Sequence, residues 1–358
     1  MLVTLTRICL LAFMSVSSLA VATIEYDVLE VPAAKSHLAS QSLVYSLERF
    51  GDRVYAGGHK GHILYSDDNG ANWVQAEVPV RLGILDIYFV NAEKGWAVGH
   101  GGVILHSEDG GATWVKQYDG YRFGNEGLKF YQDKAAADPE NELMQTLIYE
   151  MEYAVSQGAD KPFFKVYFAS ETVGYAFGAY GSIVKTEDGG ESWKHMLHTV
   201  ENDSYYHLFD YTPMANGRFL INGEAGLIFE GSVEDDYTRQ LGTSPYEGSF
   251  FTSVTAENGA LVVAGLRGFA FVSADNGENW EAVNKPMTGS VVDSVTLSDG
   301  RVVLVTVTGD VLVSSDNGSN FERANTPKVG PIFAVEDGGP GQLLLAGPRG
   351  IINVPLAN

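Results

Sequence analysis

Apolar residues recur along the chain in short runs that glycine-rich turns separate. In one stretch these runs cover Ile84 to Val90, Gly95 to Gly99, Val103 to His106 and Trp114 to Gln117. Short apolar or alternating runs bounded by turn residues are typical of strands rather than helices. This stretch therefore predicts one unit of four antiparallel strands.

The turn between the second and third strands of this unit recurs along the chain. A Gly-x-x-Gly step between two apolar strands occurs seven times when one degenerate copy is admitted, beginning at Gly58, Gly99, Gly178, Gly223, Gly265, Thr306 and Gly347. A spacing near 41 residues is the length of a four-stranded propeller blade. Dinucleotide-binding and P-loop motifs need a helix after the glycine-rich turn. No helix is expected after any copy, so neither motif is assigned to these glycines. The chain is predicted to be all-β, with a seven-bladed β-propeller over residues 23–358.

A second repeat marks the turn between the third and fourth strands of five units. Each copy follows the pattern [S/T]-x-D-x-G-x-x-[W/F], in which Asp and Ser/Thr bond the turn backbone, Gly adopts a positive φ, and the aromatic ring fills the space beneath. The pattern resembles the Asp-box, or BNR repeat, of sialidases and related propellers. The structural residues of these turns are Asp68, Trp73, Asp109, Trp114, Asp188, Trp193, Asp275, Trp280, Asp316 and Phe321.

Two units depart from the repeat. The fourth has Glu234-Asp235-Asp236-Tyr237 in place of the box but keeps apolar strands on both sides of its glycine turn, so it is predicted to be a degenerate blade. The seventh stops about one strand after its glycine turn. Because Ile24 to Leu29 alternates apolar and polar residues over most of its length, we expect this segment to close the seventh blade and cover its open edge.

An insertion of about 38 residues, roughly 121–161, lies between the second and third glycine turns. Its centre predicts a helix with Asp138 as N-cap, Pro139 at the first helical position and Gly158 after the end. The apolar stripe packs against the rim of the propeller or docks a partner helix or groove. The candidate docking residues are Leu143, Leu147, Ile148 and Met151, within a stripe that also includes Met144, Ala154 and Val155.

The first 22 residues have the features of a signal peptide, with one charge at Arg7, an apolar run from Ile8, and an Ala20-Val21-Ala22 cleavage site. A retained membrane anchor is the alternative, although the run is short for a bilayer span. The single cysteine, Cys9, lies inside this segment and is not placed for lipid attachment. We therefore expect an exported protein, periplasmic or secreted, without disulfides.

The formal net charge of −22 disfavours nucleic acid and anionic lipid as general partners, because both require clustered cations. No cofactor and no metal are expected. His195 and His198, with His207 downstream, are a poor metal set, because residues three apart on a strand face opposite sides. Solvated or strand-end histidines are the expectation.

The glycine turns and the starts of the inner strands are expected to share one face of the propeller, with the box turns on the other. The candidate partner-binding residues on that first face are His59, Lys60, His100, Tyr180, Glu224, Arg267 and Arg349. Arg267 and Arg349 are suited to bind carboxylates. The alternative is that these residues are solvated turn tips.

Two other functions remain open: a sialidase-like glycosidase, and a propeller that binds glycan without hydrolysis. A glycosidase needs two carboxyls at a fixed separation, and a sialidase also needs an arginine cluster. The chain shows no identifiable carboxyl pair and no Arg-Ile-Pro type motif near its start, and the box aspartates belong to turns. A catalytic residue is therefore not assigned.

The box turns, together with glycine turns such as Ala97-Val98-Gly99-His100-Gly101-Gly102-Val103-Ile104, resemble the photosystem II stability/assembly factor propeller family over nearly all of residues 40–358. The resemblance implies an assembly chaperone that holds a soluble segment of a membrane protein through an arginine patch. It is lumenal in photosynthetic organisms and an exported scaffold for an envelope complex elsewhere. The helical insertion and the missing lipid-attachment cysteine depart from the photosynthetic members, and the patch does not transfer residue by residue.

Overall fold

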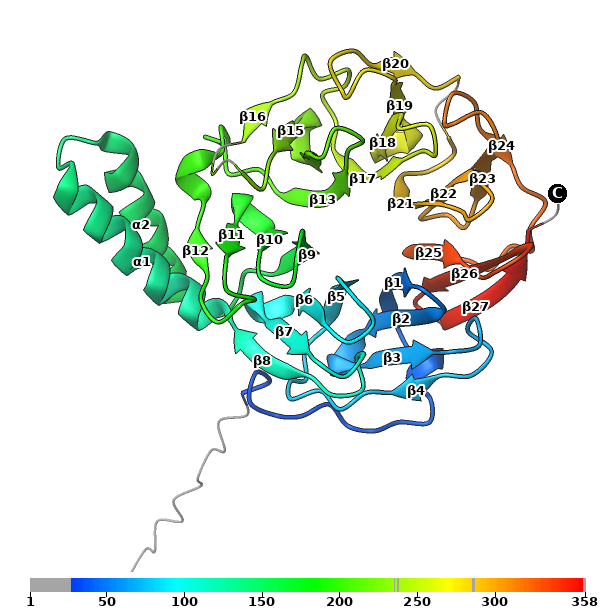
Figure 1. Cartoon of the computed structure of the whole chain (residues 1–358), viewed down its shortest axis with the longest axis horizontal. Helices are drawn as coiled ribbons and strands as arrows, with labels where there is room; N and C mark the ends of the chain where they lie inside the picture. The colour runs from blue at the N-terminus through cyan, green and yellow to red at the C-terminus, as the bar shows by residue number, and fades with distance from the viewer. Residues whose placement is uncertain (1–26, 235, 237, 285–286, 357–358) are drawn as a thin grey trace, which may run out of the picture.

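The computed structural model describes residues 27–234, 236, 238–284 and 287–356. The predicted signal peptide and the first residues of the predicted N-terminal strand lie outside this range. Seven antiparallel sheets surround a common axis, as Figure 1 shows, which confirms the predicted propeller with seven blades.

The strands of each blade run in sequence order from the axis to the rim. The first four blades are formed by β1 (Val44–Phe50), β2 (Arg53–Gly58), β3 (Ile63–Ser66) and β4 (Val74–Gln75); β5 (Ile84–Phe89), β6 (Gly95–Gly99), β7 (Ile104–Ser107) and β8 (Val115–Tyr118); β9 (Phe163–Phe168), β10 (Gly174–Gly178), β11 (Ile183–Thr186) and β12 (Lys194–His195); β13 (Leu208–Pro213), β14 (Phe219–Gly223), β15 (Ile228–Gly231) and β16 (Arg239–Gln240). The last three are formed by β17 (Phe250–Thr255), β18 (Leu261–Gly265), β19 (Ala270–Ser273) and β20 (Glu281–Ala282); β21 (Val291–Thr296), β22 (Val302–Thr306), β23 (Val311–Ser314) and β24 (Glu322–Arg323); β25 (Ala334–Asp337), β26 (Gln342–Gly347) and β27 (Gly350–Pro355).

The second strand of each blade lies between two neighbouring sheets, which explains its continuous apolar sequence. All five residues of β6, for example, are buried. Adjacent blades share apolar clusters, and the rings of Tyr55 in the first blade and Phe89 in the second stack with centroids 4.0 Å apart. Such shared burial holds the ring together without disulfides.

The ring closes through direct contact between the inner strands β25 and β1. The described part of the predicted closing strand does not join the seventh blade, so that prediction is wrong for Asp27 to Leu29. The Asp27 side chain accepts a hydrogen bond from the Leu29 N–H, which makes a turn, and Val28 O accepts from Arg81 N–H beside the second blade. The one-turn helix η1 (Ala39–Gln41) packs against β27 instead.

In all five predicted box turns the Ser/Thr hydroxyl donates to the Asp and accepts a glycine N–H, and the Asp accepts from the residue four positions later. An indole bond to the turn forms only at Trp73 and Trp114 among the described residues. In the second blade, Ser107 Oγ donates to Asp109 Oδ1 over 2.9 Å and accepts from the N–H of Gly111. Asp109 also accepts from the backbone and hydroxyl of Thr113, and the Trp114 indole donates to Gly111 O. Both carboxylate oxygens are therefore occupied within the turn.

The fourth blade keeps four strands without this arrangement, as predicted for a degenerate unit. In its place Asp236 pairs with Lys185, at 2.8 Å, and with Lys194, both from the third blade. An inter-blade charge cluster thus substitutes for a local turn.

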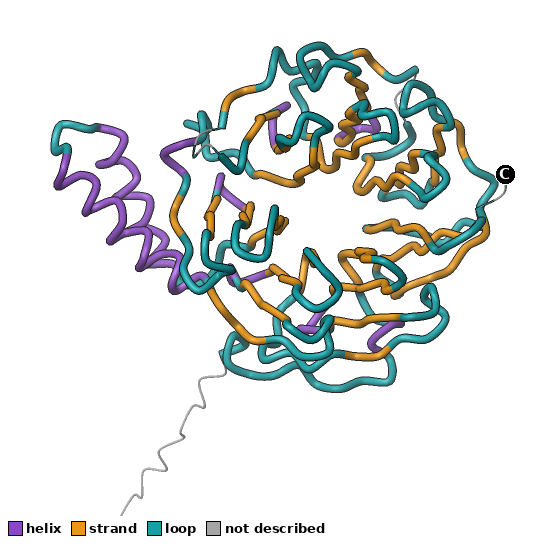
Figure 2. The backbone as a smooth tube through the Cα atoms, viewed as in Figure 1, coloured by secondary structure: helices purple, strands orange, loops and turns teal. Residues whose placement is uncertain are grey.

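The insertion forms two helices rather than one: α1 (Gly120–Ala137) and α2 (Glu142–Gln157). Figure 2 shows them extending beyond the ring. The predicted N-cap was wrong, because Asn141 caps α2 by accepting from the Met144 N–H, whereas Asp138 ends α1 and Pro139 lies between the helices. Gly158 follows the end of α2 with φ 76°, as predicted.

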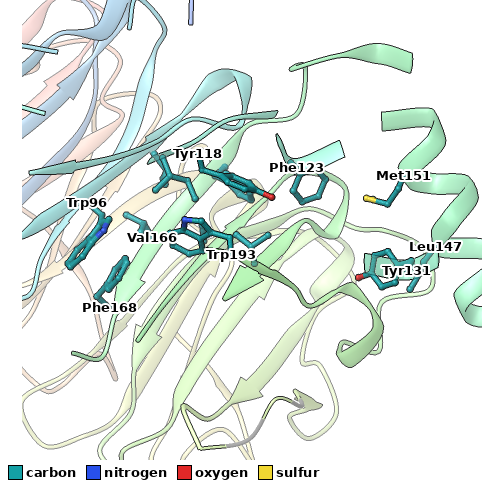
Figure 3. Packing of buried hydrophobic residues seen from close by; sticks show 14 of the residues in the cluster. Trp96, Tyr118, Phe123, Tyr131, Leu147, Met151, Val166, Phe168 and Trp193 are labelled. Carbon is teal, nitrogen blue, oxygen red and sulfur yellow. The ribbon is translucent and has the colours of Figure 1, made fainter. Parts of the chain in front are cut away.

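The helical hairpin is joined to the propeller by a shared apolar cluster. Tyr131 of α1 and Leu147 and Met151 of α2 lie on one side of this cluster, while Trp96 and Phe168 lie at its other end among the strands (Figure 3). The one-turn helix η5 (Leu197–Thr199) also contacts α2. The hairpin is therefore packed onto the third blade through its own apolar stripe.

Candidate functional site

The glycine turns and the starts of the inner strands lie on one face, here called the turn face. In six blades the first variable residue of the turn donates its N–H to the carbonyl just ahead of the inner strand. His59 bonds Leu43 O over 2.9 Å, and His100 bonds Gly83 O over 3.0 Å. Five of these turns form one-turn 3-10 helices: η2 (His59–Gly61), η3 (His100–Gly102), η4 (Ala179–Gly181), η6 (Glu224–Gly226) and η7 (Leu266–Gly268). In these six blades the bond ties the glycine turn to the start of the inner strand, whereas the seventh turn, which carries Arg349, has Pro348 at this position and no N–H to donate.

All seven candidate partner-binding residues lie on this face, and all but the half-buried Glu224 are exposed. Lys60, Tyr180 and Arg267 have φ values of 57°, 55° and 59°, in the left-handed region where a side chain costs about 1 kcal/mol. Glycine would remove this strain. Ala225 has the same conformation at the same position of its turn, with φ 54°, so the strain belongs to the turn; among the candidates, Lys60, Tyr180 and Arg267 are the ones that carry it.

Two of the candidates, Tyr180 and Glu224, meet around a third residue, His207. The Tyr180 N–H donates to His207 Nδ1 over 2.9 Å, and the two rings meet edge to face with centroids 4.9 Å apart. The His207 N–H donates to Glu224 Oε2 over 3.2 Å. Lys161 lies over the Tyr180 ring at 5.7 Å. This cluster bridges the third and fourth blades.

The basic candidates Lys60, Arg267 and Arg349 belong to the first, fifth and seventh blades, of which the first and seventh are neighbours in the ring. Arg349 donates to the carbonyl of Val329, and the Arg267 backbone donates to Ser290 Oγ. Neither Lys60 nor Arg267 forms an ion pair with another described residue. Their charges are available to a partner, although they do not form a compact patch.

The central channel has an apolar collar, which we define by seven half-buried residues, one from each blade: Tyr45, Leu85, Phe164, Phe209, Phe251, Val292 and Phe333. In the first six blades this residue is the extra one in a β-bulge, where the inner strand slips against its neighbour. A bulge redirects a side chain out of the regular alternation. The collar surrounds a cavity of about 350 Å³ that His100 also lines.

In the first six blades the residue that follows the collar residue is polar, whereas in the seventh it is Ala334. Asp86, Asp210 and Asp293 each accept a backbone N–H from the next blade, at 2.8 to 3.0 Å. Lys165 lies between the first two, with its Nζ 3.2 Å from Asp86 and 3.3 Å from Asp210. These carboxylates therefore join blades two to three, four to five and six to seven.

The channel carboxyls have pKa values displaced toward neutrality. Burial raises the pKa of Asp293 to about 7, with further repulsion from Asp210 and opposition from Lys165. Burial likewise raises the pKa of Glu336 to about 7 and that of Glu48 well above its usual value. Although burial lowers the pKa of Lys165, the Asp210 and Asp86 carboxylates hold it well above the usual range.

The sequence reasoning missed this channel. Its signal is a pair of consecutive apolar residues at the start of each inner strand, such as Ile84-Leu85 before Asp86 or Phe250-Phe251 before Thr252. A strand with one buried face alternates, so a doubled apolar residue that recurs in every blade indicates a bulge. This recurring apolar pair is visible in the sequence and is the signal from which the bulges could have been predicted.

The candidate docking residues of the insertion differ in accessibility. Leu147 and Met151 are 1% and 2% exposed and Ile148 is half-buried, whereas Leu143 is 44% exposed. His195 ends β12 as expected of a strand-end histidine. It is not solvated, because it lies beneath α1 with its Nε2 3.3 Å from the Tyr118 hydroxyl.

A family model described as "Photosynthesis system II assembly factor YCF48" matches residues 69–130 and 149–329, which is more than half of the chain. The chain belongs to this YCF48 family. The gap in the match, residues 131–148, falls within the helical hairpin. The hairpin is thus where this member departs from the family pattern.

Solved structures share the fold at low sequence identity. A YCF48 bound to a D1 peptide has a TM-score of 0.63 and 16% identity, and the alignment covers 92% of this chain and 100% of that one. YCF48 from Cyanidioschyzon merolae has a TM-score of 0.61 and 14% identity, with 88% and 96% covered. The WD40 propeller domain of Doa1 has a TM-score of 0.61 and 10% identity, with 91% and 95% covered.

No curated protein sequence matches the chain. Within the described ranges, no helix has both the length and the hydropathy required to cross a membrane. Those ranges also contain no group of three or more His, Cys, Asp or Glu side chains arranged to hold a metal ion.

Proposed function

We propose that this chain is an exported, non-catalytic assembly factor that holds an exposed segment of a membrane or envelope protein on its turn face. The observation that carries the proposal is the family match over more than half of the chain. The likeness to a YCF48 propeller bound to a D1 peptide supports a peptide segment as the bound element. The predicted signal peptide supports a periplasmic or lumenal site of action.

The turn face supplies side chains suited to such a segment. Lys60 and Arg267 carry unpaired cations in a protein of strong negative charge, and the Tyr180–His207 pair adds an aromatic surface. Aromatic and arginine side chains dominate the energetics of protein interfaces. Acidic residues of the partner would meet Lys60 and Arg267, while its apolar residues would meet Tyr180.

The absence of catalysis in this proposal is supported by how the box carboxylates and the Lys165-paired carboxylates are used, whereas Asp293, Glu336 and Glu48 form no ion pair with any described residue. Asp109 has both oxygens bonded within its own turn, and Asp86 and Asp210 bond Lys165 and the next blade. None of these groups is free to act as acid or nucleophile. Purified protein should therefore release no product from chromogenic sialosides or other glycosides.

The test is crosslinking in the native envelope followed by affinity purification and mass spectrometry. The wild-type chain should recover one membrane or envelope protein, and Lys60→Ala combined with Arg267→Ala should reduce that recovery severalfold. Lys94→Ala is the matched control, because it removes a cation in the β5–β6 turn on the opposite face. Undiminished recovery by the double variant, or recovery of glycan without any protein, would overturn the proposal.

A further inference from the structure

The cavity inside the collar presents apolar walls to solvent. Phe209 lies 5.7 Å from Phe164 and 5.2 Å from Phe251, between ring centroids, so the aromatic wall is continuous over the third to fifth blades. All seven collar residues remain half-buried rather than packed away. Their exposed apolar surface would be covered by an apolar group of a ligand, which is favourable at about 25 cal/mol per Å².

Charge in the channel is unevenly compensated. Lys165 neutralises Asp86 and Asp210 on the second and fourth blades. Asp293, Glu336 and Glu48, on the sixth, seventh and first blades, form no ion pair with any described residue. These blades are neighbours in the ring, since β25 contacts both β21 and β1. We call these three residues the acidic arc; Asp293 lines the cavity, and Glu48 and Glu336 lie outside its lining but interact electrostatically with Asp293.

A polar side chain in the cavity wall also has no partner. Ser46 lines the cavity and is 7% exposed, yet its Oγ makes no hydrogen bond within the described structure. A buried hydroxyl without a partner costs about 1–3 kcal/mol. It lies on the first blade, on the same side as the acidic arc, and offers an acceptor to a ligand N–H.

We propose that the channel mouth binds an ammonium or guanidinium group carried on an apolar stem, with the stem inside the collar and the cation against the acidic arc. This chemistry is shared by a lysine or arginine side chain of a bound peptide and by a free organic amine. The inference stands apart from the proposed function, because it concerns the channel and not the cations of the turn face.

Binding of such a cation depends on pH. Because the pKa of Asp293 and Glu336 is about 7, both carboxyls lose protons between pH 6 and 8. The groups that face Asp293 are Lys165, Asp210, Glu48 and Glu336, and Glu336 also faces Arg49 and Asp337. An alkylamine stays charged over this range, since its pKa is near that of lysine, about 10.4. Affinity should therefore rise as pH increases from 6 to 8.

The test is a ligand-observed NMR titration of the full chain with 4-phenylbutylammonium and with neutral 4-phenylbutan-1-ol. We expect a dissociation constant of the order of millimolar for the amine. The amine should bind at least about ten-fold more tightly than the alcohol. Asp293→Asn should weaken amine binding about ten-fold, which corresponds to about 1.4 kcal/mol, and leave the alcohol unchanged. Phe209→Ala should weaken both probes.

Asp299→Asn is the matched control, because Asp299 is an exposed carboxylate paired with Arg301 in the β21–β22 turn, away from the channel mouth. A third arm uses the peptide acetyl-Phe-Lys-amide. Tighter binding of the peptide than of the amine identifies a protein segment as the source of the cation, and the reverse identifies a small molecule. Equal binding of amine and alcohol, or an Asp293→Asn variant that binds as wild type does, would overturn the proposal.

Discussion

The hairpin stripe provides a stability prediction with an internal control. Leu147 is 1% exposed, within the cluster that joins α2 to the third blade, whereas Leu143, one turn earlier on the same helix, is 44% exposed. Truncating a buried leucine to alanine costs about 2–5 kcal/mol, because transfer energy is lost and a cavity remains. The same truncation at an exposed helical position costs under about 1 kcal/mol, and alanine's helix propensity offsets part of it.

The buried change is large enough to measure by thermal unfolding. At about 2.1 cal/mol/K per residue, roughly 330 ordered residues have an unfolding entropy of about 0.7 kcal/mol/K. A loss of about 3 kcal/mol from Leu147→Ala therefore lowers Tm by about 4 °C. Leu143→Ala should lower Tm by less than about 1 °C. Differential scanning calorimetry, with chemical denaturation as a second measurement, distinguishes the two.

Two results would contradict this reasoning. Equal Tm shifts for the two variants would mean that Leu147 is not packed as the structure has it. Loss of amide protection confined to residues 120–157, with an unchanged main transition, would mean that the hairpin unfolds independently of the third blade. In that second case the apolar stripe would be available for a partner after local opening.

Three further predictions concern stability. The pKa of Asp293 in the folded protein is about 7, above its usual 3.8. Its contribution to the free energy of unfolding is therefore fully present below about pH 4 and is lost as pH rises through 7. Asp293→Asn should flatten this decline in denaturant titrations. His195 and His198 have pKa values of about 3 and 4 in the folded protein, below the usual 6.5. Their contribution to the free energy of unfolding is therefore lost as pH falls from about 6.5 toward 3. His195→Phe should reduce that loss of stability in acid. Ser273→Ala leaves the buried Gly277 N–H without its acceptor and should lower the free energy of unfolding by about 1–3 kcal/mol in a denaturant titration.

The number of blades was predictable because each blade contains turns that require particular residues at fixed positions, such as Gly with a positive φ and Asp bonded to the turn backbone. The glycine step and the box recur at blade spacing whatever the strands contain. The predicted N-terminal strand was wrong over Asp27 to Leu29, the part that the structure describes, for the converse reason. Alternation in Ile24 to Leu29 is compatible with a strand, but Asp27 bonds the backbone two residues later and makes a turn in the described part.

The first helix of the insertion was missed because its glycines lower its intrinsic propensity. A Cβ on Gly127 would come within 2.6 Å of the Met151 sulfur and the His195 ring, and one on Gly124 within 3.2 Å of Val155. These glycines are therefore what allow α1 to approach α2 and the third blade. Tertiary contact outweighed the low helix propensity of glycine. A single sequence does not show whether a given glycine forms a turn or allows a close contact between helices.

The collar and the turn face are linked by the repeat itself. In the first blade the carbonyl of Leu43 accepts the turn N–H of His59, and Tyr45, two residues later, is the collar residue; the fifth blade repeats this with Ser249, Leu266 and Phe251. This hydrogen bond joins backbone atoms only, so the side chains at the turn tips and in the collar can vary without breaking it. If the turn-tip cations hold a partner segment as proposed, that segment would lie near the collar, and a lysine or arginine in it would be placed to reach Asp293. A partner segment with both an acidic and a basic residue would bind the turn-tip cations and the acidic arc together. Substitution at either place should therefore weaken binding only in part, and the two losses of binding free energy should add.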